Sequence, residues 1–213
     1  MQVVSVKSLG SPQGEAYRIG LSDGSLFSIK SVYVPSEYYA EALWVVGKVL
    51  SSQEEGALRF AASCVRAERQ ALDLVARAEQ SSRGLSRKLK QRGHATSCVQ
   101  RVLARLIEQA IVSDSRYAQM WLRSRLARRL ESPRYLIAAL CHRGIDRDIA
   151  QEALTEVLDL DTELAMLNRY LEKKQPILTG SLTNIRQKLK YEGFSSPVID
   201  LLEEREEDYL PRT

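Results

Sequence analysis

The side chains that could catalyse a reaction show no spacing that favours a particular reaction, because the carboxylates are spread over the faces of expected helices. The 213 residues include two histidines, and neither lies in a pattern typical of a nucleophile or of a general acid and base pair. His94 with Cys98 and Cys141 with His142 would supply four zinc ligands, but the familiar Cys-x-x-Cys spacing is absent. We therefore expect a protein that is not an enzyme and that holds no metal or other cofactor.

Basic side chains carry the clearest chemical signal. Residues 83–147 contain 15 Lys and Arg but four Asp and Glu, whereas the rest of the chain contains 16 basic and 23 acidic residues. A block of one sign attracts a partner of the other sign over about 10 Å at roughly 0.1 M salt. The block therefore predicts binding to nucleic acid or to an acidic protein. The candidate binding residues are Arg87, Lys88, Lys90, Arg92, Arg123, Arg125, Arg128, Arg129, Arg143 and Arg147.

The densest part of this block is the segment 121–130, where Arg123, Arg125, Arg128 and Arg129 flank a stripe of leucines. Four guanidinium groups within about two helical turns repel one another unless an acidic partner receives them. A solvated helix face that only aids solubility is the alternative interpretation. We favour an interaction surface, because few acids lie nearby in the sequence.

These basic residues lie within a pattern that occurs three times. Two apolar residues four apart are followed by a glycine and then by another apolar residue: Leu85, Leu89, Gly93, Val99; Leu136, Leu140, Gly144, Ile149; and Ile185, Leu189, Gly193, Val198. The glycines, 51 and then 49 residues apart, are typical of helices that end in a left-handed cap. Each copy predicts a helix, a short turn and a second helix, and a further apolar helix precedes each copy. Such a tandem presents a long surface rather than a pocket.

The expected fold class is mainly α: an elongated tandem array of three three-helix, helix-turn-helix-like repeats, preceded by a small N-terminal β-hairpin extension. We place the hairpin extension at 1–35, a linking helix at 36–53, and the repeats at 54–112, 113–160 and 161–213. The last repeat includes an acidic tail. In this tail, residues 200–208 hold six acids and one arginine.

Turn and cap residues support these elements. Apolar alternation on both sides of Asp23-Gly24 predicts the hairpin, with the second strand continuing to Val34. Ser132-Pro133 and Ser196-Pro197 predict helix starts, because serine caps a helix and proline suits its first turn. Asp146, and Thr96 or Ser97, are expected to cap the remaining second helices.

The apolar runs and the cysteines of the sequence indicate the cellular compartment. No apolar run approaches the roughly 18 residues that cross a bilayer, and residues 1–7 lack the apolar core of a signal peptide. Three cysteines without paired spacing suit reduced thiols. We expect a cytoplasmic monomer that has no membrane partner.

Several segments carry a resemblance to a known family. They are Ala71-Leu-Asp-Leu-Val75, Ser86 with Leu89 and Gly93, the segment 106–118, and Leu136 to Ile145. In these segments, and over about residues 60–205, the chain resembles the RecX family of bacterial recombination regulators. It departs from the family pattern where many members have a glycine in place of Ala110, a second acid in place of Ser115, and a glycine within 130–133. These departures affect local turn geometry more than identity.

The resemblance implies a regulator that binds the filament of the recombinase RecA on single-stranded DNA. Such a regulator acts in DNA recombination, DNA repair and the SOS response, and mostly inhibits the recombinase, ATPase and co-protease activities of RecA without catalysis. Single-stranded DNA would be a partner indirectly, or directly but weakly. The alternative is a helix-turn-helix-like regulator on duplex DNA, although the helix starts at 95–98 and 146–148 offer few base-reading side chains. A generic protein adaptor is a third hypothesis.

Overall fold

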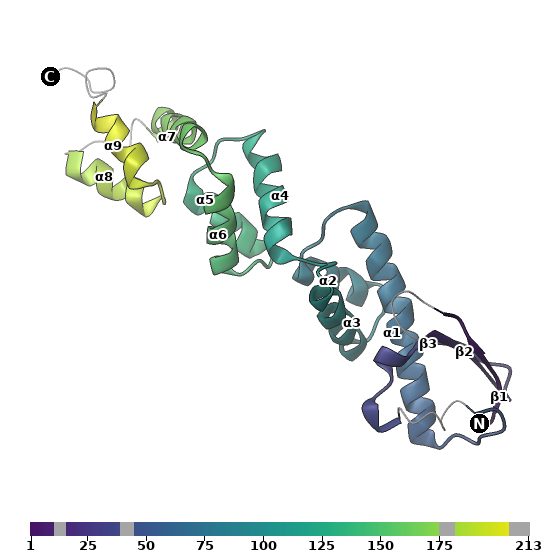
Figure 1. Ribbon diagram of the computed structural model, residues 1–213. Helices are drawn as coiled ribbons and strands as arrows, with labels where there is room; N and C mark the ends of the chain where they lie inside the picture. The colour runs from purple at the N-terminus through teal and green to yellow at the C-terminus, as the bar shows by residue number, and fades with distance from the viewer. Residues whose placement is uncertain (11–15, 39–44, 175–181, 205–213) are drawn as a thin grey trace. The chain divides into compact units, whose positions relative to one another are not determined.

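The computed structural model describes residues 1–10, 16–38, 45–174 and 182–204 and is mainly helical, with a small N-terminal sheet (Figure 1). This fold class is the one expected from the sequence. The chain divides into two compact units, Met1–Val112 (unit 1) and Ser113–Thr213 (unit 2), and each is described by itself. Unit 1 contains β1 (Val3–Ser8), β2 (Ala16–Leu21), β3 (Leu26–Lys30), the 3-10 turns η1 (Ser31–Tyr33) and η2 (Ser36–Tyr38), α1 (Ser52–Arg77), α2 (Ser82–Gln91) and α3 (Thr96–Glu108). Unit 2 contains α4 (Asp114–Leu126), α5 (Pro133–His142), α6 (Arg147–Val157), α7 (Leu160–Lys174), α8 (Leu182–Tyr191) and α9 (Ser196–Glu204).

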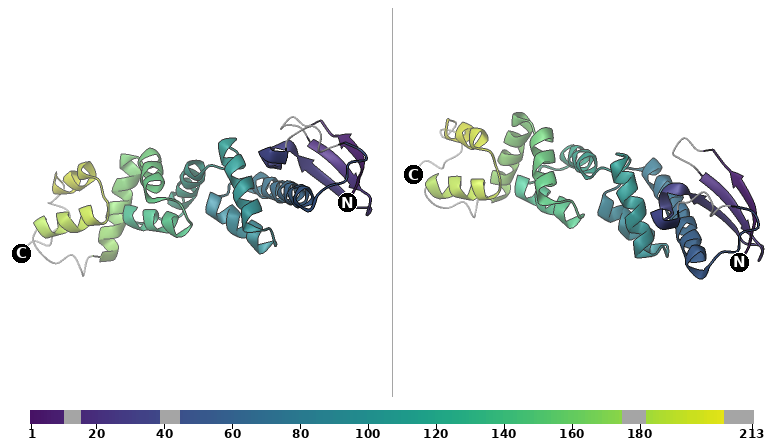
Figure 2. Two further views of the ribbon diagram at one scale, coloured as in Figure 1. Left: turned by 90° about the horizontal axis from the view of Figure 1, so that it is seen from below. Right: turned by 60° about the horizontal axis from the view of Figure 1, so that its bottom comes forward.

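The predicted hairpin is present and forms part of a three-stranded antiparallel sheet in the order β1-β2-β3. Ile19 pairs with Val6 on one side and with Phe27 on the other. Gly24, with a φ of +82°, makes the expected turn, and the Asp23 carboxylate accepts a hydrogen bond from the backbone N–H of Ser25. The sheet lies against α1, as both views of Figure 2 show, and its apolar residues share one core with α1, α2 and α3.

The second strand ends earlier than the alternation predicts, and the linking helix expected at 36–53 is wrong for the described residues. β3 stops at Lys30, and Ser31–Tyr33 is a 3-10 turn. Among the described residues of 36–51 only η2 is helical, whereas residues 47–50 pair with Met1–Val3: Val3 donates a hydrogen bond to Lys48 O and Leu50 donates one to Met1 O. This pairing satisfies backbone groups that a helix would otherwise satisfy. The remainder of that predicted helix, 39–44, lies outside the described residues.

The three repeated glycines end their helices in the same way. Gly93, Gly144 and Gly193 have φ angles of +85°, +88° and +87°. In each copy the glycine N–H bonds to the carbonyl three residues earlier, and the next N–H bonds to the carbonyl five residues earlier, at 2.9–3.2 Å. This pair of bonds is the Schellman motif, which satisfies carbonyls that the end of a helix leaves unpaired. The sequence pattern therefore predicts the turn correctly in all three copies.

The predicted caps are partly correct. Ser132 caps α5 through a hydrogen bond from Tyr135 N, and Pro133 is the first residue of the helix. The other caps differ from the prediction. The helix α9 begins one residue earlier than expected, and the carbonyl of Ser195 accepts its first helical hydrogen bond. Ala95 precedes α3 without a side-chain bond, and Asp146 precedes α6 without one. A helix start tolerates a missing cap where water reaches its first N–H groups.

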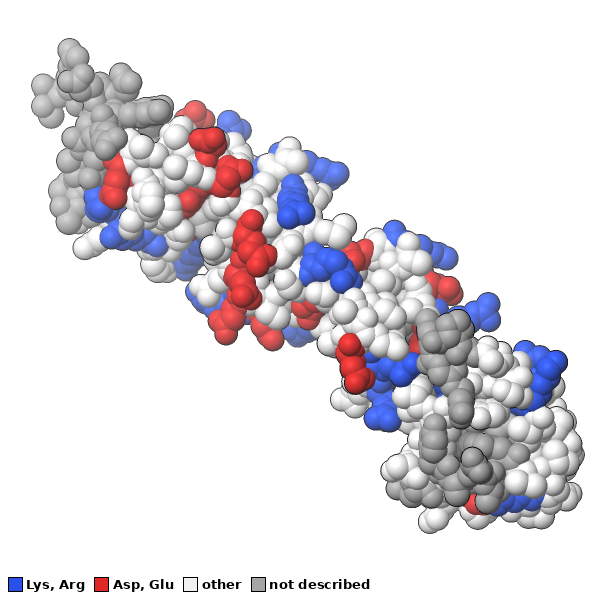
Figure 3. Space-filling view, viewed as in Figure 1, with Lys and Arg blue, Asp and Glu red and all other residues white. Residues whose placement is uncertain are grey.

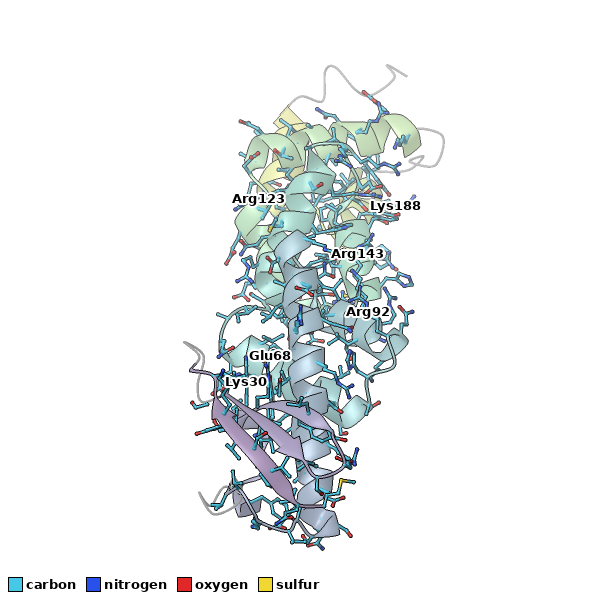
Figure 4. All side chains as sticks on the ribbon, turned by 90° about the vertical axis from the view of Figure 1, so that its right-hand side faces the viewer. Lys30, Glu68, Arg92, Arg123, Arg143 and Lys188 are labelled. Atoms are coloured by element: carbon cyan, nitrogen blue, oxygen red, sulfur yellow. The ribbon has the colours of Figure 1, made fainter. Side chains whose placement is uncertain are left out.

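A buried ion cluster joins the sheet to the helices of unit 1. Glu68 on α1 is 2% exposed; its carboxylate lies 2.5 Å from Lys30 Nζ of β3 and 3.6 Å from Arg105 Nε of α3. Figure 4 shows Lys30 and Glu68 next to each other where the sheet meets α1. Tyr33, from η1, is also buried beside them, and burial, followed by the Glu68 charge, raises the pKa of Tyr33. One acid thus ties three elements together.

Unit 2 has one core of its own, to which α4–α9 all contribute. The turn between α8 and α9 packs against the start of α5. The backbone N–H of Arg134 donates to Glu192 O at 2.9 Å, and Ser132 Oγ donates to the Glu192 carboxylate at 2.9 Å. Glu163 of α7 accepts hydrogen bonds from both the N–H and the hydroxyl of Ser195. Polar contacts and the shared core therefore hold α7–α9 against α4–α6.

The first prediction concerns Ala110, which follows α3 with a φ of +54° and makes the same two bonds as the glycines. Left-handed backbone costs alanine about 1–2 kcal/mol, whereas glycine adopts it freely but loses more entropy on folding. Ala110→Gly should therefore stabilise unit 1 by about 0.5–1 kcal/mol in urea unfolding. Ala104→Gly makes the same change at an exposed position within α3 and should destabilise by about 1 kcal/mol. If both variants changed the free energy of unfolding in the same direction, this would contradict a strained left-handed conformation at Ala110.

The second prediction concerns Glu68. Glu68→Ala leaves Lys30 and Arg105, whose side chains are 14% and 15% exposed, without this carboxylate. We expect a loss of about 2–3 kcal/mol in the free energy of unfolding. Glu108→Ala removes an exposed acid from α3 and should change it by less than about 0.5 kcal/mol. Similar losses for both variants would show that the cluster does not stabilise the fold.

Candidate polyanion-binding surface

The basic cluster of unit 1 lies on the last turns of α2. Arg87, Lys90 and Arg92 are exposed, and among the described residues none of the three makes an ion pair. Lys88 is partly buried, and its Nζ donates to Gln80 Oε1 at 2.7 Å. Cations near a helix C-terminus also interact favourably with the helix dipole. Three of the four predicted residues here therefore present their charge to solvent.

The four arginines of the segment 123–129 differ from one another. Arg125 forms two hydrogen bonds, of 2.7 and 2.8 Å, to the Glu131 carboxylate, and these bonds raise its pKa. Arg123, Arg128 and Arg129 are exposed, and no ion pair joins them to any part of the chain that the structure describes. The helix also ends earlier than the leucine stripe predicts, because α4 stops at Leu126.

Arg143 and Arg147 lie on the two sides of the Gly144 turn. Arg143 follows α5, donates to Ala139 O at 2.9 Å, and stacks on the Trp121 ring with its guanidinium carbon 4.7 Å from the ring centre. Arg147 is the first residue of α6 and is exposed. Stacking fixes the Arg143 guanidinium in one direction, which lowers the entropy it loses on binding an anion.

The predicted residues of unit 2 do not share one side of that unit. Figure 4 shows Arg143 and Lys188 on one side and Arg123 on the other. Exposed acids also follow α6 at four-residue spacing, at Asp148, Glu152 and Glu156, and Figure 3 shows a red stripe over this helix. Unit 2 therefore has distinct surfaces of opposite sign.

Sequence reasoning missed a set of aromatic side chains that hold arginines. Arg125 lies 5.8 Å from the Trp121 ring centre, and Arg134 stacks at 3.8 Å on Tyr191. Tyr135 contributes, after Glu131, to the raised pKa of Arg125. The Trp121–Arg125 spacing of one helical turn is a signal for the first pair. The sequence offered no signal for Arg134 with Tyr191, because α5 and α8 meet only in the folded unit. We name this set the arginine–aromatic cluster: Trp121, Arg125, Arg134, Tyr135, Arg143 and Tyr191.

His94 and Cys98, two of the four residues considered as zinc ligands, contact Gln70 and Cys64. His94 Nε2 lies 3.1 Å from Gln70 Oε1, and burial, followed by Arg66 and Arg92, lowers the pKa of His94. Cys98 Sγ lies 3.0 Å from Cys64 Sγ inside the core of unit 1. Within the described ranges, no three His, Cys, Asp or Glu side chains are grouped as metal ligands. None of the described helices is both long and apolar enough to cross a membrane.

Comparisons with known proteins identify the family. The family model of the second three-helix domain of RecX matches residues 113–154. Regulatory protein RecX of Treponema pallidum (strain Nichols) is 34% identical over 123 residues, which are 58% of this chain and 75% of that protein. This chain belongs to the RecX family. Regulatory protein RecX of Pseudomonas entomophila is 32% identical over 140 residues, 65% of this chain and 90% of that protein.

Solved RecX structures share the fold. A crystal structure of regulatory protein RecX aligns with a TM-score of 0.64 at 20% identity and covers 95% of this chain and 98% of its own. RecX from Lactobacillus salivarius aligns with a TM-score of 0.50 at 19% identity, over 67% and 96% of the two chains. The RecX relatives are regulatory proteins by name, which supports a regulatory role for this RecX-family chain.

The third prediction tests the pairing of Arg125 in this RecX-family protein. Glu131→Gln removes the charge that holds Arg125 and should raise affinity for heparin roughly threefold to fivefold near 0.15 M salt, the effect of about one added anionic contact. Glu108→Gln makes the same charge change on α3 in unit 1 and should give a smaller increase. Salt elution from immobilised heparin measures both variants. An equal increase would show that Arg125 contributes only to net charge.

Proposed function

We propose that this chain binds the RecA filament formed on single-stranded DNA and modulates, mostly by inhibition, its recombinase, ATPase and co-protease activities. Membership of the RecX family supports this proposal, as do the exposed cations on and just after α2 and α4. The action is non-catalytic: the bound protein occupies filament surface that substrate DNA or a cleavable repressor would use.

Exposed cations on both units support a contact at more than one point. Arg87, Lys90 and Arg92 belong to unit 1, whereas Arg128 and Arg129 belong to unit 2. When one unit is bound, the linked unit meets the same polymer at a high effective concentration. Two weak contacts on a repeating filament then give tighter binding than either contact gives alone. A polymer with repeated acidic or phosphate groups suits this arrangement better than a small ligand does.

The observation that carries the proposal is the exposure of Arg123, Arg128 and Arg129 without an acidic partner among the described residues. Guanidinium groups crowded at the end of one helix repel one another, and an acidic partner relieves that repulsion. Arg125 is excluded from this group because it forms a bidentate pair with Glu131.

The fourth prediction replaces Arg123, Arg128 and Arg129 by alanine in the full chain. Affinity for preassembled RecA filaments on single-stranded DNA should fall about tenfold or more, and inhibition of the RecA ATPase should weaken in parallel. Circular dichroism should stay unchanged, because the three side chains are exposed. A control triple, Arg66, Arg69 and Arg77 to alanine, removes the same charge from exposed positions of α1 and should change affinity less than threefold.

The same salt series includes RecA alone, bare single strands and bare duplex. The proposal expects the filament to bind more tightly than any of these. Duplex binding equal to filament binding would contradict it and favour the helix-turn-helix-like alternative. Equal losses for the two triple variants would show that binding responds to net charge and not to Arg123, Arg128 and Arg129.

A further inference from the structure

We propose that the arginine–aromatic cluster of unit 2 binds single-stranded nucleic acid directly, with the Tyr135 and Tyr191 rings stacking on bases. The proposal extends the filament function by naming a surface for the strand itself. It concerns bare strands, so it stands or falls separately from RecA binding.

The cluster draws its residues from three helices or their ends, α4, α5 and α8. Arg143, after α5, lies over Trp121 of α4, and Trp121 also lies near Arg125, one turn further along α4. Tyr135, in the first turn of α5, contributes after Glu131 to the raised pKa of Arg125. The neighbouring Arg134 lies over Tyr191 at the end of α8. Cations and aromatic rings are therefore paired in two groups of unit 2, Arg143 and Arg125 with Trp121 and Arg134 with Tyr191, and Tyr135 follows Arg134 in α5.

The two tyrosines present their rings to solvent. Tyr135 is 53% exposed and Tyr191 is 67% exposed, the latter despite the arginine at 3.8 Å from its ring centre. Packing in the core of unit 2 does not explain why a tyrosine occurs at either position, because other side chains make that core. Exposed rings beside guanidinium groups are the components with which proteins hold single strands: bases stack on the rings while the cations meet phosphates.

Hydrogen bonds and an ion pair within unit 2 orient the three arginines of the cluster. The backbone N–H of Arg134 donates to Glu192 O, and the guanidinium of Arg134 lies 3.9 Å from the Glu192 carboxylate. Glu131 holds Arg125, and Ala139 O holds Arg143. These contacts fix the planes of the guanidinium groups before a ligand arrives, which lowers the cost of ordering them on binding.

The two glutamates also decide which kind of partner fits. Glu131 and Glu192 offset two of the three arginine charges in the cluster. An acidic peptide, which binds through charge alone, gains little from such a surface. A single strand gains from stacking, which each aromatic ring supplies regardless of net charge and which raises affinity by a factor of about 5 to 150 per base. A duplex keeps its bases stacked on one another and cannot offer their faces to the rings.

The fifth prediction uses the full chain and a fluorescein-labelled oligothymidylate of 20 nucleotides. Replacing both Tyr135 and Tyr191 by alanine should weaken binding at least tenfold, whereas replacing both by phenylalanine should keep affinity within about twofold, because the rings remain. Ile107→Ala removes an apolar side chain of similar exposure, 49%, from unit 1 and should have no effect. Circular dichroism verifies that all variants fold.

Competition by unlabelled ligands identifies which kind of molecule the cluster binds. Unlabelled duplex and polyglutamate should compete poorly, and the affinity should depend less steeply on salt than that of a site made of unpaired arginines. Oligouridylate that competes equally assigns the surface to single strands of either sugar, and failure to compete assigns it to DNA. The proposal is overturned if the double alanine variant binds as the wild type does, if the phenylalanine variant loses as much as the alanine variant, or if polyglutamate competes as well as the strand. Loss of strand binding with unchanged filament binding supports the cluster and leaves the filament proposal in place.

Discussion

The left-handed glycine turn is the constraint on which the rest of this structure depends. At Gly93, Gly144 and Gly193 the chain leaves one helix and satisfies two carbonyls, and after Gly144 and Gly193 the next residue enters the core. Ile145 and Phe194, which follow two of these glycines, are 3% and 4% exposed. Any L-residue other than glycine is strained at such a φ. The turn thus fixes where each helix pair meets, and the positions of the surrounding cations follow from it.

The residue just before each glycine shows how one backbone geometry serves different purposes. Arg92 and Arg143 occupy this cap position in the first two copies. Glu192 occupies it in the third, where its carboxylate accepts a hydrogen bond from Ser132 and lies near Arg134. In two copies the position presents a cation, and in the third it joins α8 to α5. Equivalent backbone positions therefore carry a proposed binding residue in two copies and a packing contact in the third.

The sequence predicted the elements that depend on local chemistry and missed those that depend on tertiary contact. Glycine spacing predicted three helix ends, and Asp23-Gly24 predicted the hairpin, because φ preference and turn chemistry act over a few residues. The segment before α1 has helix-like spacing of apolar residues, yet residues 47–50 pair with Met1–Val3, and Leu50 donates a hydrogen bond to Met1 across 49 residues. Residue charges predicted the basic block, but not that Glu131 pairs with Arg125.

The pairing of single arginines, more than the total charge, determines what this surface can do. An arginine without an acidic partner, such as Arg123, acts as a mobile charge whose contribution falls with salt. An arginine held by a carboxylate and an aromatic ring, such as Arg134, loses much of its field but keeps a flat, oriented face. The first kind suits attraction to an extended polyanion, and the second suits contact with flat groups at short range. Unit 2 carries both kinds, so our proposals assign long-range attraction and short-range selectivity to different residues of the same unit.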